Sequence, residues 1–269
     1  MTNGSLVYTA GRGVVIANAG QGLLVNTGRA WAPGLVVNTR VLTDATVECL
    51  PEAPPHVPVI ASQRTDNELR QGFCPAAVAA AVQETFDDVH RLTVGDLEVE
   101  LIEAGPAHAL GDTVVWLPAD RVLITGDLLR NGVHLSTVTG SPSAWRDSCD
   151  RLLRLEPNLV VPGQGPPGGA QLLGTIRDYL ARLCDVAATC HAAGMPLVDA
   201  SASIIGSHWP DWAVPENLVK TVAARYRELG AEDATTLHAM IAFDRLSDGY
   251  RSPRRDRGLD HLDLIKDRP

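Results

Sequence analysis

Short apolar runs bounded by turn-forming residues recur up to about residue 165 of this chain, and this pattern most constrains its fold. Such runs are typical of single strands buried in a sheet that is covered on both faces. Glycine, proline and aspartate separate several of them, which favours hairpins. A longer segment, 94–104, alternates apolar and acidic residues and predicts a half-buried strand. The apolar runs are 14–17, 23–25, 35–37, 57–61, 114–117, 122–124 and 159–161, the last of which we expect Pro162 to stop.

Three stretches with apolar residues at the helical period accompany these strands. The spacing predicts helices over 143–155, which begins with a capping serine, over 170–190, and over 215–229, which opens with proline and ends at Gly230. Strands alternating with helices predict an α/β layered sandwich in one domain, residues 1–243. The polar, partly basic segment 244–269 is expected to be a flexible end or an arm on a partner subunit.

Composition excludes several classes of partner. Among 269 residues the net charge is −9, and a field of that sign repels nucleic acid and anionic lipid, so we expect neither nucleic acid nor membrane as a partner. No apolar run approaches the roughly 20 residues that span a bilayer, and the first residues have no basic or apolar leader pattern, which predicts a cytoplasmic protein. The five cysteines form no C-x-x-C pair, so reduced thiols are expected.

Three segments together resemble the metallo-β-lactamase superfamily, in that family's order along the chain. The resemblance implies an αββα four-layer sandwich, here with a shortened N-terminal crossover between residues 25 and 35. Within the superfamily, the chain is most similar to the polyketide-cyclase-like and hydrolase branch of actinobacterial secondary metabolism. The segments are Val36-Val37-Asn38-Thr39 with Asp44, Gly105-Pro106-Ala107-His108-Ala109-Leu110-Gly111-Asp112 with Gly126-Asp127, and Val160-Val161-Pro162-Gly163-Gln164-Gly165-Pro166.

The resemblance also implies a centre of two zinc ions held by five histidines and two aspartates, and most of those ligands are missing. Each ion would retain two protein ligands, whereas zinc sites normally have at least three. An arginine at one ligand position adds a permanent positive charge beside two dications. We therefore predict a metal-free protein with no other cofactor. Arg40, Leu42, Ala45 and Gln164 replace four histidines, and Asp44, His108 and Asp127 remain.

The remaining acidic residues suggest how such a site could work without metal. We expect Arg40 to neutralise Asp44 and Asp127, because converging carboxylates without a cation would raise each other's pKa. His108, beside these carboxylates, would act as the acid–base group, with Asp127 orienting it and Arg40 stabilising an enolate or oxyanion. Three further side chains are expected to contact the substrate: His134, Gln164 and Leu42.

Three functions remain open from the sequence. The first is a metal-independent enzyme that acts on a small molecule, a cyclase or lyase using proton transfer next to a carbonyl. The second is a non-catalytic pseudoenzyme, the partner or regulator of an active relative. The third is a rebuilt hydrolase with one metal ion on His108, His134 and Asp127. A homodimer or a complex with an active relative is an additional expectation.

Overall fold

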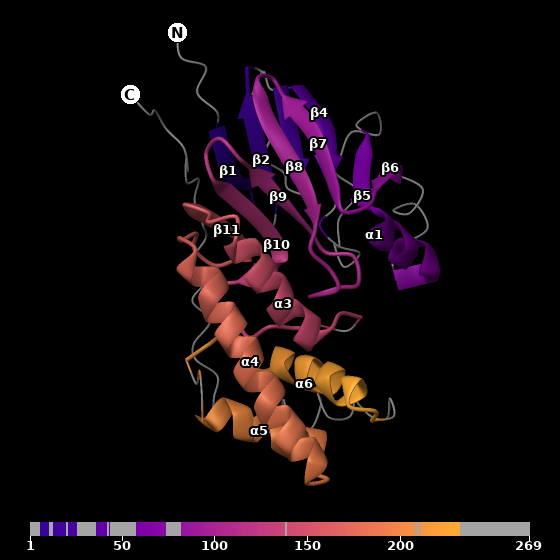
Figure 1. The fold of residues 1–269 in the computed structure, drawn as a ribbon, viewed down its shortest axis with the longest axis vertical. Coiled ribbons are helices and arrows are strands. Elements are labelled where there is room, and N and C mark those ends of the chain that lie inside the picture. Colours follow the sequence, from indigo (N-terminus) through magenta and orange to yellow (C-terminus); the bar gives the residue numbers. More distant parts are fainter. Residues whose placement is uncertain are drawn as a thin grey trace.

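Two β-sheets packed face to face form the upper part of the molecule, and helices cover the outside and extend below it (Figure 1). The computed structural model describes residues 6–10, 13–19, 21–25, 36–41, 43, 58–73, 82–137, 139–207, 209 and 211–231. The tail predicted at 244–269, and the end of the domain predicted to reach residue 243, lie outside these residues.

The first sheet is mixed, with an antiparallel half and a parallel half. Strands β1, β2 and β3 pair antiparallel, and the remaining pairs are parallel. The hairpin predicted from 14–17 and 23–25 is confirmed, since Val14 pairs with Val25. Beyond β3 the chain returns parallel as β4, and residues 26–35 of that crossover lie outside the described part. In sheet order the strands are β1 (Leu6–Ala10), β2 (Gly13–Asn18), β3 (Gln21–Val25), β4 (Val36–Val41), β5 (Val59–Ser62) and β6 (Val82–Phe86).

The second sheet is antiparallel except for one parallel pair, β10 with β11. The hairpin predicted from 114–117 and 122–124 is confirmed by the pairing of Trp116 with Leu123. Strand β11 continues through Pro162, contrary to our expectation. It is the edge strand of this sheet, where a residue without a backbone N–H is tolerated. The strands, from one edge to the other, are β11 (Leu159–Gln164), β10 (Val122–Arg130), β9 (Thr113–Leu117), β8 (Leu97–Glu103) and β7 (Val89–Val94).

The three predicted helices are present, with small shifts at their ends. The first begins at Pro142, and its N-cap is Ser141, whose hydroxyl accepts a hydrogen bond from the backbone of Ala144. The sequence patterns did not indicate three elements, α1, the π-helical turn η1 and α5. The helical elements are α1 (Gln63–Glu68), η1 (Leu69–Phe73), α3 (Pro142–Leu153), α4 (Gln171–Ala192), α5 (Leu197–Ser207) and α6 (Glu216–Glu228).

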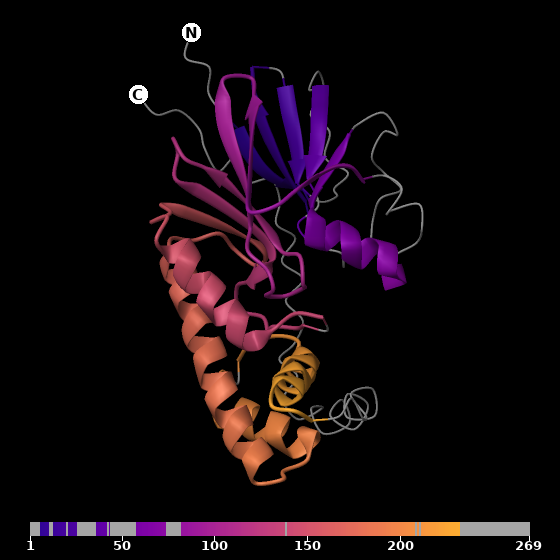
Figure 2. The same ribbon diagram turned by 45° about the vertical axis from the view of Figure 1, so that its right-hand side comes forward.

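Two hydrophobic cores hold these layers together. One lies between the sheets and includes Ile16, Leu101 and Ile124. The other lies between the second sheet and the helices, around Trp145 and Tyr179. Helices α3 and α4 cover the outer face of the second sheet, and α5 and α6 pack on the far half of α4 (Figure 2). This arrangement confirms the predicted α/β sandwich with sheets flanked by helices. None of the helices described here is both long enough and apolar enough to cross a membrane.

Candidate functional site

Three of the residues predicted to form the site lie at one end of the second sheet. His108 lies in the loop between β8 and β9, Asp127 lies in β10, and Gln164 ends β11. The parallel pairing of β10 with β11 sets Arg130 opposite Gln164. A side chain at Gly163 would lie 2.6 Å from Oδ1 of Asp127, so the carboxylate sits directly over this glycine.

The loop that carries His108 is fixed at both ends. The carbonyl of Asp112 accepts hydrogen bonds from the backbone of Ala104 and Gly105, at 2.7 and 3.2 Å, and its carboxylate accepts one from Ala109 at 2.7 Å. Beside Asp112, the backbone N–H of Gly111 donates a hydrogen bond to the buried carboxylate of Glu68 in helix α1. A preorganised loop of this kind holds its side chains in one orientation.

The ring of His108 is buried and has a defined orientation. Its Nδ1 lies 2.5 Å from the carbonyl oxygen of Ser136, and the ring packs 5.9 Å from that of Trp145. The Thr137 hydroxyl donates to the His108 carbonyl at 2.6 Å, which joins the same two segments again. Because a carbonyl only accepts, this contact assigns a proton to Nδ1, and in the neutral ring the lone pair is then on Nε2. Nε2 is therefore the nitrogen through which a neutral His108 would act as a base.

Asp127 forms an ion pair with an arginine that the sequence analysis did not consider. Nη2 of Arg130 lies 2.6 Å from Oδ2 of Asp127, and both side chains are largely buried, at 12% and 21% exposure respectively. The predicted partner, Arg40, is described for its backbone alone in β4, and Asp44 and Leu42 lie outside the described residues. The Arg40 pairing therefore stays a prediction, while Arg130 supplies the guanidinium in the described part of the site.

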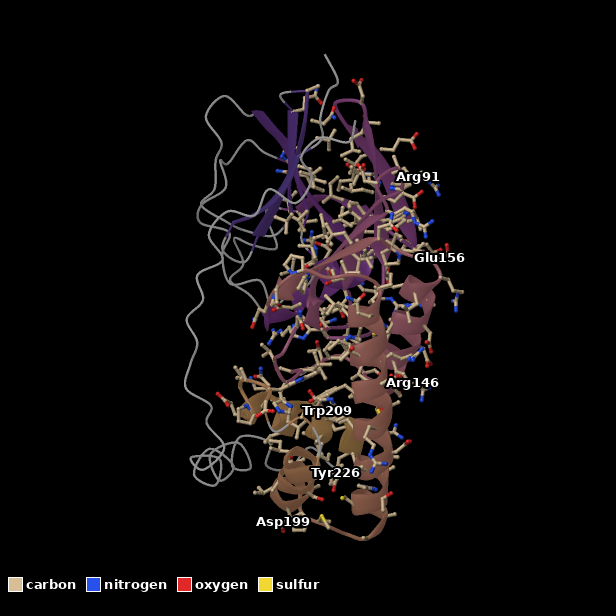
Figure 3. The ribbon with its side chains drawn as sticks, turned by 90° about the vertical axis from the view of Figure 1, so that its left-hand side faces the viewer. Arg91, Arg146, Glu156, Asp199, Trp209 and Tyr226 are labelled. Atoms are coloured by element: carbon tan, nitrogen blue, oxygen red, sulfur yellow. The ribbon has the colours of Figure 1, made fainter. Side chains whose placement is uncertain are left out.

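His134 does not share the surroundings of His108. Its Nδ1 lies 3.1 Å from the hydroxyl oxygen of Tyr179, and its ring packs against Tyr179 and Trp212, at 5.9 Å from each. Tyr179 also stacks on Trp212 at 4.9 Å and lies 4.6 Å from Trp209, which sits between the sheets and helix α5 (Figure 3). We call these four residues the aromatic cluster. The sequence predicts His134 at the substrate, but the structure places its ring, with no exposed surface, inside the helical layer.

Burial gives His134 a pH-dependent effect on stability. Loss of solvation lowers its pKa from 6.5 to about 4, and a backbone contact with Trp209 offsets part of that effect. Above pH 6.5 the ring is neutral in both the folded and unfolded states. Between pH 6.5 and 4 only the unfolded state takes up the proton, so the free energy of unfolding should fall by about 3 kcal/mol.

Urea unfolding at steps between pH 7 and 4 measures this loss. His134→Leu should remove most of it. Equal pH dependence in the wild type and His134→Leu would contradict the assignment.

The side chains present do not fit the two-zinc centre that the resemblance implies. Among the residues that the structure describes, no three His, Cys, Asp or Glu side chains lie close enough together to hold a metal ion. The carboxylate that would bridge two ions, Asp127, is neutralised by Arg130. Gln164, at the end of β11, offers a neutral amide in place of an imidazole. Zinc prefers imidazole, thiolate and carboxylate ligands, so this donor set is a poor one.

Comparisons with known proteins agree with the fold. A family model described as "Metallo-beta-lactamase superfamily" matches residues 29–164, just over half of the chain. A curated relative, metallo-beta-lactamase type 2 of Bacillus cereus, is 32% identical over 100 residues, which is 35% of this chain and 39% of the relative. The enzyme of the same name from Bacteroides fragilis is 29% identical over 93 residues, 33% of this chain and 37% of the relative. The chain thus matches under two fifths of the length of these two relatives.

Solved structures are similar over a larger part of the chain. The metallo-beta-lactamase from Pontibacter korlensis aligns with a TM-score of 0.55 and 20% identity, covering 63% of this chain and 86% of that one. The DIM-1 metallo-beta-lactamase aligns with a TM-score of 0.53 and 21% identity, at the same coverage. At such identities the similarity shows the fold alone. Helices α4 to α6 follow the segment that the family model matches.

Proposed function

Because the chain belongs to the metallo-beta-lactamase superfamily, we propose that it uses the fold of these hydrolases to act on a small carbonyl compound without a metal ion. The reaction we propose is proton transfer next to the carbonyl, with His108 as the acid–base group. The observation that supports it is the hydrogen bond between His108 Nδ1 and the Ser136 carbonyl, which fixes the ring and makes Nε2 the basic nitrogen of the neutral tautomer. The mismatch of the donor set with zinc supports the metal-independent part of the proposal.

The proposed step moves one proton and one electron pair. Nε2 of His108 takes a proton from the carbon next to the carbonyl, and the electron pair of that C–H bond moves to the carbonyl oxygen to give an enolate. A positive group must stabilise the enolate oxygen, and Arg40 remains the predicted donor. The enolate carbon can then attack a second carbonyl, whose oxygen takes the proton from His108. Alternatively the enolate expels a hydroxyl group from the neighbouring carbon, which leaves as water with that proton, or the proton returns to the substrate. These outcomes correspond to cyclisation, dehydration and isomerisation.

Hydrogen–deuterium exchange tests the step without a known substrate. Proton NMR in D2O follows exchange at the carbon next to the carbonyl in a set of simple ketones and β-ketoesters. We expect the wild type to accelerate exchange of at least one compound above the buffer rate. His108→Asn should lower that acceleration about 10²–10⁴-fold, the usual contribution of a general acid–base group.

A histidine away from the site provides the control. His90 lies in β7, where its ring packs 5.8 Å from Phe86, and His90→Asn should leave the exchange rate unchanged. The same samples, purified without chelator, are analysed for zinc, and we expect well below one ion per chain. Exchange that is unaffected in His108→Asn, or two zinc ions per chain, would overturn the proposal.

A non-catalytic role as the partner of an active relative is the second candidate. The Asp127–Arg130 pair favours it, because a carboxylate held by a neighbouring guanidinium on its own strand is less available to a reaction. Absence of exchange above the buffer rate for every carbonyl compound, combined with co-purification of a relative with intact zinc ligands, would favour this role over catalysis.

A further inference from the structure

We propose that helix α6 positions His108, through Asn217 and Thr221, so that these two are positioning residues for the candidate site. The inference rests on the proposed function for its catalytic meaning, because it concerns the same histidine. The hydrogen bonds from α6 to the two carbonyls before Ser136 stand independently of that function.

The segment that carries Ser136 is held to the chain just before α6 by backbone pairing. Val133 and Ala213 form an isolated parallel bridge. The backbone N–H of His134 donates to the Ala213 carbonyl at 2.9 Å, and the N–H of Ala213 donates to the Gly132 carbonyl at 3.0 Å. The aromatic cluster anchors the same segment by the His134 ring. Residues 132–134 are therefore fixed before the chain reaches Ser136.

Two side chains of α6 hold the next part of the segment. Nδ2 of Asn217 donates to the His134 carbonyl at 3.1 Å, and the hydroxyl of Thr221 donates to the Leu135 carbonyl at 2.8 Å. The carbonyl that follows, that of Ser136, bonds to His108 Nδ1. Three consecutive carbonyls thus have fixed partners, two from α6 and one from the candidate base. Because Thr221 is completely buried, no water replaces its hydroxyl without rearrangement.

The other end of α6 is tied to the helix that packs against His108. Oε1 of Glu228 accepts hydrogen bonds from the hydroxyl groups of Ser141 and Ser143, at 2.5 and 3.0 Å, at the start of α3. Trp145, one turn further along α3, contacts the His108 ring. Helix α6 therefore supports both groups that contact the His108 ring. It holds the segment before the Ser136 carbonyl, and it binds the start of the helix that carries Trp145. The family model ends at residue 164, before α6. The contacts that support His108 through α6 therefore come from a part of the chain that the family model does not match.

A shift of this segment should matter because the Ser136 carbonyl sets the tautomer of His108. The hydrogen bond at one ring nitrogen determines which nitrogen carries the lone pair. Losing the Thr221 hydroxyl leaves the Leu135 carbonyl without this donor and frees the neighbouring carbonyl to move. Displacements of about 1 Å at a reacting group lower rates by as much as about 10²-fold.

Nitrogen-15 NMR of histidine-labelled protein tests the proposal independently of activity. At a pH where the ring is neutral, the wild type should show His108 with its proton on Nδ1. Thr221→Val, which removes the hydroxyl at nearly constant volume, should shift the two ring nitrogen signals toward a mixture of tautomers. Asn217→Ala should shift them in the same direction, and Thr221→Ser, which keeps the hydroxyl, should restore the wild-type signals. In the exchange assay Thr221→Val should lower kcat about 10-fold with KM unchanged.

Ser201→Ala is the matched control for this experiment. The Ser201 hydroxyl is also completely buried and also donates to a backbone carbonyl, that of Leu197, but within α5. This variant should leave the His108 signals unchanged. Unaltered His108 signals in folded Thr221→Val and Asn217→Ala would overturn the positioning role, whatever the exchange assay shows. If those signals shift but His108→Asn exchanges at the wild-type rate, the positioning role stands and the proposed function fails.

Discussion

Replacing Trp145 with alanine should lower the free energy of unfolding by about 3–5 kcal/mol, because it empties the centre of the sheet–helix core. The indole is completely buried, packs on His108, and donates from Nε1 to the Leu128 carbonyl at 3.0 Å. No polar group of alanine replaces that donor, so the Leu128 carbonyl in β10 also loses this hydrogen bond. Urea unfolding followed by far-UV circular dichroism measures the loss.

Two further variants separate the contributions of volume and hydrogen bonding. Trp145→Phe keeps most of the ring and loses the N–H, so it should cost about 1–3 kcal/mol. Trp212→Ala removes the same side chain from a partly exposed position and should cost less than Trp145→Ala. A loss below about 1 kcal/mol for Trp145→Ala would show that this core is not packed as described.

Replacing Arg130 with methionine should lower the free energy of unfolding by about 3–5 kcal/mol, since it removes the guanidinium that pairs with the largely buried Asp127 carboxylate at 2.6 Å. The double variant Asp127→Asn/Arg130→Met removes both charges and should recover most of the loss. Chemical unfolding of the wild type, Asp127→Asn, Arg130→Met and the double variant completes the mutant cycle.

An exposed ion pair gives the comparison for that cycle. Arg91 and Glu100 pair at 2.8 Å across β7 and β8, with the Arg91 side chain 74% exposed (Figure 3). Arg91→Met should cost less than about 1 kcal/mol, as exposed pairs do. If Arg130→Met and Arg91→Met have equal effects, the Asp127–Arg130 pair does not hold the end of β10.

The strands of the sandwich core were predictable because their sequences are apolar on both faces. Segments such as 114–117 and 122–124 are buried throughout and carry turn residues between them. Strands β6 and β7 were not predicted, since β6 is polar along its centre and β7 alternates weakly. The short helix α1 was also missed, because six residues are too few for a helical period to show.

The candidate site was predictable in part. The resemblance groups His108, Asp127 and Gln164 in one site, and in the structure these three residues lie at one end of the second sheet. Arg130 was missed because residues three apart on a regular strand point to opposite faces, and here register shifts along β10 bring it to the carboxylate of Asp127. The surroundings of His134 depend on Tyr179, 45 residues further along the chain, and no local pattern reports such a contact.

The aromatic cluster also gives the protein an intrinsic optical signal. Trp212 and Tyr179 stack within 10° of parallel, and Trp209 lies 5.8 Å from Trp212. Closely spaced rings in a fixed geometry couple their electronic transitions, which produces strong bands in near-ultraviolet circular dichroism. His134 packs against Trp212, and its backbone carbonyl accepts a hydrogen bond from Asn217 of α6. The bands should therefore change when the packing of the segment from His134 to Ser136 changes. Changes in the packing of this segment can thus be followed in solution without a label.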